Sequence, residues 1–90
     1  MNQQMSKTVV IVNELGLHAR SAAKIARLAQ QATSDVWLEF DGEQADATSI
    51  IDLLSLGCAQ GTTVTVTVQD GQDINILDAL VDLIQNGFGE

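Results

Sequence analysis

The residues best suited to chemistry surround one histidine, His18, which lies between a glycine-containing turn and the start of a predicted helix. The first turn of a helix presents unpaired backbone N–H groups and the positive end of the helix dipole. A phosphate held at His18 would therefore meet backbone amides just after it and the guanidinium of Arg20. Imidazole is neutral and nucleophilic near neutral pH, so this pattern indicates reversible phosphoryl transfer. The alternative is a histidine that only hydrogen-bonds a turn.

Two predicted elements position this histidine. Residues 5–12 are rich in β-branched side chains and predict a strand that stops at the turn containing Gly16. Residues 19–32 predict a helix whose buried stripe has the i, i+3, i+4, i+7 spacing and consists of Ala22, Ile25, Ala26 and Ala29. Another side of the helix carries a basic ridge formed by Arg20, Lys24 and Arg27.

The rest of the chain predicts three strands and two helices. Alternating apolar residues predict strands near 36–41, 44–47 and 62–68, with Val64, Val66 and Val68 facing the core. Ser49 and Asp52 resemble a capping box for a short helix that ends at Gly57. Asp73 is expected to cap a last helix, which Gly87 terminates. Its buried stripe is expected to be Leu77, Leu80, Val81 and Ile84.

The element order β-α-β-β-α-β-α predicts an α+β open-faced sandwich. We expect a four-stranded antiparallel sheet with three helices on one face, and with the 62–68 strand between the first and second strands. Ninety residues allow one domain, spanning 1–90, and the scarcity of aromatic residues requires an aliphatic core.

Composition excludes several classes of function. One cysteine, Cys58, and one histidine exclude a disulfide scaffold and a multi-cysteine or multi-histidine metal centre, and we expect neither metal nor cofactor. We expect Cys58 to pack as a small hydrophobic residue. No apolar run approaches the roughly 20 residues of a membrane helix, and no signal peptide is evident, so a cytoplasmic protein without membrane insertion is expected.

Charge is unevenly distributed along the chain. The formal net charge of −8 argues against nucleic acid or an anionic membrane surface as a general partner. Residues 1–34 hold all four cations and one acid, a net of +3, whereas residues 35–90 hold eleven acids and no cation. Such a distribution can make a local basic site on an acidic body.

Two motifs resemble one known family. The segment LGLHARSAA, residues 15–23, resembles the active-site segment of the histidine-containing phosphocarrier protein (HPr) family of the bacterial phosphotransferase system, whose signature is Gly-Leu-His-x-Arg-Pro-Ala. The segment from Ser49 to the Val/Thr strand at 62–68, with LG at 56–57 and QGT at 60–62, resembles that family's regulatory-serine helix and last strand. The resemblance covers essentially the whole chain.

The resemblance implies a phosphoryl relay rather than a stand-alone catalyst. His18 would be phosphorylated on Nδ1 by enzyme I, which draws on phosphoenolpyruvate. Arg20 would neutralise the phosphate, and the backbone of Ala19 and Arg20 would bind it. An enzyme IIA-type component or a regulatory acceptor would then receive the phosphoryl group, in sugar uptake or its regulation.

The helix that begins after Ser49 carries two further expectations. Ser49 caps the helix, which is worth about 1 kcal/mol, and by resemblance a dedicated ATP-dependent kinase phosphorylates it. Ile50, Ile51 and Leu54 cannot all be buried on so short a helix. By resemblance they form an apolar docking patch, which we expect to act together with Lys24 and Arg27 in a transient interface. The alternative is an apolar helix end without a function.

Three positions depart from the family pattern. Ser21 replaces the usual proline, which makes the helix start less rigid but adds an N–H and a hydroxyl that could bind phosphate. Leu15 stands where some members carry asparagine. Asp52 stands where many carry lysine, which should slow association with the acidic surfaces of enzyme I and enzyme IIA.

Three interpretations of function remain open at this point. The first is a phosphocarrier that uses His18. The second is a regulatory module whose partners change with phosphorylation of His18 or Ser49, without sugar transport. The third is a scaffold that only keeps the fold, against which the His18–Arg20 pair argues. An independent phosphotransferase is not expected because no nucleotide-binding glycine loop is present. A monomer is the simplest assembly.

Overall fold

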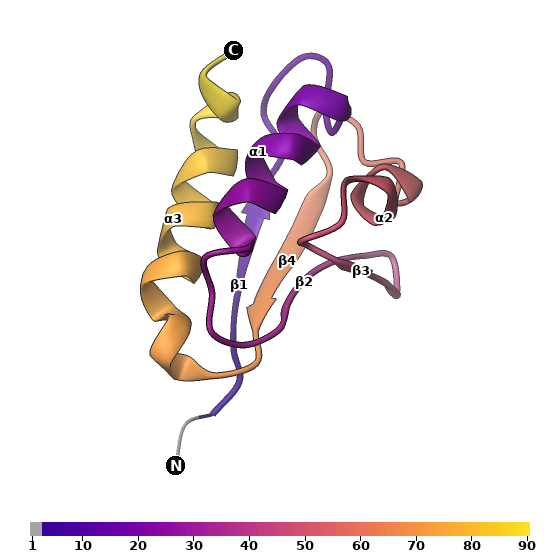
Figure 1. Cartoon of the computed structure of the whole chain (residues 1–90). Helices are drawn as coiled ribbons and strands as arrows, with labels where there is room; N and C mark the ends of the chain where they lie inside the picture. The colour runs from indigo at the N-terminus through magenta and orange to yellow at the C-terminus, as the bar shows by residue number, and fades with distance from the viewer. Residues whose placement is uncertain (1–2) are drawn as a thin grey trace.

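A computed structural model describes residues 3–90, with three α-helices packed on one face of a four-stranded sheet (Figure 1). The strands are β1 (Met5–Val10), β2 (Val36–Phe40), β3 (Glu43–Asp46) and β4 (Thr63–Val68). The helices are α1 (Ala19–Ala29), α2 (Ile50–Ser55) and α3 (Ile74–Gln85), with short 3₁₀ turns η1 (Gly71–Asp73) and η2 (Gly87–Gly89) beside α3.

The sheet has the predicted topology. Its strand order is β1-β4-β2-β3, and every neighbouring pair is antiparallel. Val64 of β4 lies opposite Val9 of β1, and Val66 lies opposite Leu38 of β2. The position of β4 between β1 and β2 confirms the predicted open-faced sandwich.

The core is aliphatic, as composition requires. The alternating valines of β4 and the small residues of α1 are buried as predicted, and so is Cys58. Burial raises the pKa of the Cys58 thiol, as expected for a residue that packs without reacting. In α3, Leu77, Leu80 and Ile84 are buried, whereas Val81 packs at the edge of the core. Phe88, after α3, is a buried aromatic residue that the helix pattern did not predict.

Asp73 is the N-cap residue of α3, as predicted, but its side chain does not cap the helix. Instead, the buried carboxylate accepts hydrogen bonds from the amides of Thr33 and Ser34, both at 2.9 Å, and from their hydroxyls at 3.0 and 2.5 Å. Asp73 therefore joins α3 to the turn before β2, a contact across 40 positions of sequence.

Other differences concern the ends of elements. The structure ends β1 at Val10 and α1 at Ala29, earlier than predicted. The Ser49 cap of α2 is present, because Ser49 Oγ accepts the Asp52 amide at 3.2 Å. The expected capping box is only half formed, because the Ser49 amide donates to the Asp46 carbonyl. Within residues 3–90, no helix combines the length and the apolar character needed to cross a membrane.

Candidate functional site

The loop between β1 and α1 is shaped by a tight turn and by a contact with a distant loop. Gly16 has φ +66°, a left-handed conformation that glycine adopts without strain, and its amide donates to Asn13 O at 3.1 Å. The next amide, that of Leu17, donates to Cys58 O at 2.9 Å. The loop that follows α2 therefore supports the residue immediately before His18.

His18 is the N-cap residue of α1. Its backbone is extended, with φ −127° and ψ −177°, and its carbonyl accepts the Ala22 amide at 2.8 Å. The ring nitrogen Nδ1 accepts the Arg20 amide at 3.2 Å. About a quarter of the side chain is exposed (26%), so a docking protein can reach the ring. His18 thus lies where the sequence predicts it, with Nδ1 toward the unpaired amides of the helix start.

Ser21 has a structural role that the sequence analysis did not predict. It is completely buried, and its Oγ accepts the His18 amide at 2.9 Å. The same hydroxyl lies 3.2 Å from Gly16 O and 3.1 Å from His18 O, the carbonyls to which it can donate. The His18 side chain in turn accepts a backbone amide of the helix start, so the two residues form a capping box. This capping replaces the rigidity of proline at the helix start. The Ser21 hydroxyl is therefore occupied, contrary to the expectation that it is free to meet a phosphate, and only the amide remains as a predicted phosphate ligand.

The three cations of α1 differ in their surroundings. Arg20 and Arg27 are exposed, and within residues 3–90 neither guanidinium pairs with an acidic side chain. Lys24 is half-buried, and its Nζ donates to Phe88 O at 2.5 Å. The basic ridge thus presents two free guanidinium groups, whereas its middle ammonium group binds the segment after α3.

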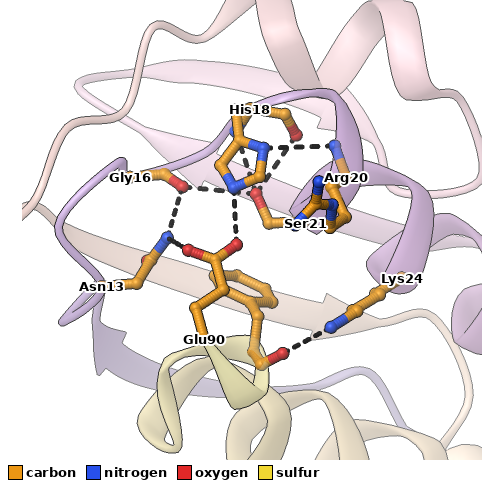
Figure 2. Close-up of polar contacts among 8 residues, drawn as sticks. Asn13, Gly16, His18, Arg20, Ser21, Lys24 and Glu90 are labelled. Carbon is orange, nitrogen blue, oxygen red and sulfur yellow. Dashed lines mark hydrogen bonds and ion pairs between the residues drawn. The ribbon is translucent and has the colours of Figure 1, made fainter.

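Glu90 is the site residue that sequence analysis missed. Its Oε2 lies 2.5 Å from His18 Nε2, and its Oε1 accepts a hydrogen bond from Asn13 Nδ2 at 3.0 Å (Figure 2). Hydrogen bonds from Asn13 and then from the imidazole hold the pKa of the Glu90 carboxyl below its ordinary value. Glu90 and His18 are 72 positions apart, and no motif connects them, so a single sequence contains no signal for this pair.

The helix α2 presents the expected apolar surface. Ile51 is 80% exposed, Ile50 40% and Leu54 38%, whereas Leu53 is fully buried. This confirms the expectation that these three side chains are not all buried. We call Ile50, Ile51 and Leu54 the α2 patch. The loop after α2 bonds the loop before His18, so the patch and the histidine belong to neighbouring parts of the surface.

The arrangement around Nδ1 fits a phosphoryl group. A phosphate on this nitrogen would be close to the first amides of α1 and to the side of the helix that carries Arg20. Within residues 3–90, no group of three acidic, histidine or cysteine side chains is arranged to hold a metal ion.

Known proteins share the whole of this architecture. The family model described as the PTS HPr component phosphorylation site matches residues 5–86. The phosphocarrier protein HPr of Cupriavidus necator is 40% identical, covering 96% of this chain and 97% of its own. A crystal structure of HPr from Thermoanaerobacter tengcongensis superposes with a TM-score of 0.87 at 40% identity, covering 96% and 97% of the two chains.

A further relative has a regulatory name. The structure of Crh, the Bacillus subtilis catabolite repression containing protein, is described as a domain-swapped dimer. It matches with a TM-score of 0.73 and 39% identity, covering 82% of this chain and 85% of that one. The matched family model and the full-length relatives confirm the resemblance found in the motifs around His18 and Ser49. This chain belongs to the HPr family of phosphocarrier proteins of the phosphotransferase system.

Proposed function

We propose that the protein accepts a phosphoryl group on Nδ1 of His18 from phosphorylated enzyme I and passes it to an enzyme IIA-type acceptor. The observation that carries this proposal is the position of His18 as the N-cap of α1, with Nδ1 facing the Arg20 amide. A carrier supplied by phosphoenolpyruvate through enzyme I would work in the cytoplasm.

The proposed transfer uses groups that already surround the ring. Nδ1 attacks the phosphorus atom of the donor, and the bond between phosphorus and the donor's imidazole breaks. The Arg20 amide, which donates to the free Nδ1 at 3.2 Å, then becomes available to a phosphoryl oxygen, together with the Ala19 and Ser21 amides. The exposed guanidinium of Arg20 offsets the charge of the phosphoryl group, a pairing that arginine geometry favours.

We assign partner docking to the α2 patch and to Arg27. The patch is apolar, and α1, the helix that contacts α2, carries the exposed Arg20 and Arg27. Apolar contact combined with charge is the composition of a transient interface. Lys24 was predicted to take part, but its ammonium group already binds Phe88 O. We therefore expect Lys24 to contribute less to partner attraction than Arg20 and Arg27.

Ser49 is proposed as a site of regulatory phosphorylation. It lies directly before the α2 patch, and its Oγ accepts the Asp52 amide. A phosphate at Ser49 would place a charge of about −2 next to the docking surface, where it would repel acidic partners. The kinase would be a separate ATP-dependent protein.

The second candidate function is regulatory. Crh, which is 39% identical to this chain, is named for catabolite repression. In this reading, the phosphorylated state of His18 or Ser49 changes which proteins bind, and no sugar is transported. Incubation of the phosphorylated protein with an enzyme IIA separates the two functions. A carrier would transfer its phosphoryl group to the enzyme IIA, whereas a regulatory module would keep the group and change its binding partners.

We propose a monomer as the working form, in contrast to the domain-swapped dimer described for Crh. Sedimentation equilibrium of the purified protein over a range of concentrations tests this directly. A stable dimer would contradict it.

The central experiment is phosphorylation by enzyme I from the same organism with phosphoenolpyruvate and Mg²⁺, read by intact mass. We expect one phosphoryl group on the parent protein and none on His18→Ala. The adduct should be labile in acid and stable in base, as phosphohistidine is. No gain of mass while enzyme I phosphorylates itself would overturn the proposed donor, and an unchanged gain in His18→Ala would overturn the proposed site.

A further inference from the structure

A carboxylate and a backbone amide contact opposite nitrogens of the His18 ring (Figure 2). Nε2 lies 2.5 Å from Glu90 Oε2, and Nδ1 lies 3.2 Å from the Arg20 amide nitrogen. An ionised carboxylate can only accept a hydrogen bond, and a backbone N–H can only donate one. Together the two contacts require the ring proton on Nε2 and the lone pair on Nδ1.

Glu90 is held in this position by the segment that precedes it. Phe88 is buried (1% exposed), and its carbonyl accepts Lys24 Nζ at 2.5 Å. The Glu90 amide donates to Gly87 O at 3.0 Å, and Asn13, itself buried, binds Oε1. The lowered pKa of Glu90 keeps the carboxylate ionised near neutral pH. These contacts therefore hold the Glu90 carboxylate in position beside the His18 ring.

We propose that Glu90 is a positioning residue for phosphoryl transfer at His18: it keeps the proton on Nε2, so that Nδ1 presents its lone pair to phosphorus. This inference rests on the proposed function and extends it to a residue outside both motifs. Asn13 has a supporting role, because its Nδ2 joins Glu90 Oε1 to the carbonyl of Gly16, at 2.7 Å from the latter. The arrangement resembles the way a carboxylate orients histidine in hydrolase triads.

A proton kept on Nε2 assists both the arrival of the phosphoryl group at His18 and its departure. As the Nδ1 lone pair forms the bond to phosphorus, the pair of the breaking bond returns to the donor's imidazole. The accepting ring becomes cationic while its proton stays on Nε2, and the Glu90 carboxylate stabilises that cation. In onward transfer, a ring that has kept its Nε2 proton leaves phosphorus as neutral imidazole, which is a better leaving group than an imidazole anion.

The test compares Glu90→Gln with the parent protein. Glutamine offers one oxygen and one NH₂ group, so it cannot accept from both Asn13 and Nε2. With its oxygen toward Asn13, its NH₂ faces Nε2 and favours the Nδ1–H tautomer instead. We expect ¹⁵N chemical shifts of the neutral ring to show Nε2–H in the parent and a large share of Nδ1–H in Glu90→Gln.

The kinetic expectation is a maximal rate of phosphorylation by enzyme I that falls about tenfold or more in Glu90→Gln, with the KM for the carrier unchanged. Glu14→Gln is the matched control, because Glu14 is an exposed acid in the loop before His18. It should retain both the parent's tautomer and its rate. Glu90→Asp, which keeps a carboxylate, should recover part of the rate.

The outcomes separate this inference from the proposed function. If the parent accepts phosphate and Glu90→Gln matches it in tautomer and rate, Glu90 has no positioning role. A parent ring that already carries its proton on Nδ1 would also overturn the inference, as would a changed tautomer with an unchanged rate. A parent that is never phosphorylated would instead overturn the proposed function, while the tautomer of the unphosphorylated ring still reports on the Glu90 contact itself.

Discussion

Gly16 packs directly against the backbone of Cys58: a Cβ atom at position 16 would lie 2.6 Å from the Cys58 carbonyl oxygen. That carbonyl also accepts the Leu17 amide at 2.9 Å. The close approach joins the loop before His18 to the loop after α2. Glycine is needed at position 16 both for its positive φ and for the lack of a side chain, so the position of His18 depends on it.

Gly16→Ala should destabilise the protein and displace His18. The left-handed backbone alone costs about 1–2 kcal/mol for alanine, and the clash with Cys58 adds to this. Gly57→Ala is the matched control, since Gly57 has the same φ of +66° but no atom within 4 Å of its added Cβ. Urea denaturation should show a clearly larger loss of unfolding free energy for Gly16→Ala than for Gly57→Ala. Equal losses would mean that the clash with Cys58 does not add to the cost of the substitution.

Ser21→Ala should weaken the start of α1. The substitution leaves the His18 amide without its 2.9 Å partner in a part of the protein where Ser21 is completely buried. Losing this part-buried hydrogen bond should cost about 1 kcal/mol, visible as a lower denaturation midpoint and faster amide exchange in residues 18–22. Ser55→Ala, at an exposed serine of α2, should change stability by less than about 0.5 kcal/mol. A loss confined to the control would contradict the capping role.

The elements and the loop that carries His18 were predictable because their signals are local. His18 follows a glycine turn and begins a helix, and β4 alternates valine with threonine, so periodicity and capping chemistry suffice. Family resemblance supplied the proposed role of His18, which the local pattern alone left open. The topology followed from the element order and the preference for antiparallel neighbours.

The contacts that could not be predicted join distant parts of the sequence. Asp73 precedes a helix and has the ideal residue type for a cap, yet the amides and hydroxyls at 33–34 compete successfully for its carboxylate. Lys24 belongs to a charged face by spacing, but its Nζ donates to the Phe88 carbonyl in the segment after α3. Glu90 reaches His18 from the segment after α3, in which Phe88 is buried, so this contact depends on tertiary packing rather than on local sequence.

Asp73→Asn should destabilise the protein in a pH-dependent way. Hydrogen bonds from the Ser34 hydroxyl and the Thr33 amide, above all, hold the pKa of the Asp73 carboxyl below its ordinary value. For a lowered folded-state pKa, the stabilisation is fully present above the unfolded-state pKa of about 3.9 and is lost as pH falls through the folded-state value.

The expected cost of Asp73→Asn at neutral pH is about 1–3 kcal/mol, because an amide cannot accept from all the donors at 33–34. Denaturation at a series of pH values should show the difference from the parent narrowing as pH falls below about 4. Asp82→Asn, at an exposed position of α3, serves as the control and should show no such trend. A constant difference across this range would contradict the role assigned to the charge.

Ile51→Ser should weaken partner docking without affecting the fold. Ile51 is 80% exposed, so little apolar burial is lost in the free protein. If the α2 patch meets enzyme I, the KM for phosphorylation should rise about five- to tenfold while the denaturation midpoint stays constant. Val10→Ser tests specificity, since Val10 is 44% exposed on the β1 edge strand. An equal effect from Val10→Ser would point to a different docking surface.

Two substitutions of Ser49 should separate its structural role from its proposed regulatory one. Ser49→Ala removes the oxygen that accepts the Asp52 amide at 3.2 Å, which should cost about 1 kcal/mol but leave the docking surface uncharged. Ser49→Asp keeps a capping oxygen and favours the helix dipole, so stability should be retained. Its charge lies beside the α2 patch, however, and should repel acidic partners.

We therefore expect opposite orders in two assays. In urea denaturation, Ser49→Asp should have the same free energy of unfolding as the parent, and Ser49→Ala should have a lower one. In transfer from enzyme I, Ser49→Ala should match the parent and Ser49→Asp should be slower, with a difference that shrinks as salt is raised because exposed charges are screened. Equal transfer rates for both variants would show that charge at Ser49 does not regulate this step. A slower rate for Ser49→Asp that does not depend on salt concentration would mean that the aspartate acts through its shape rather than through charge repulsion.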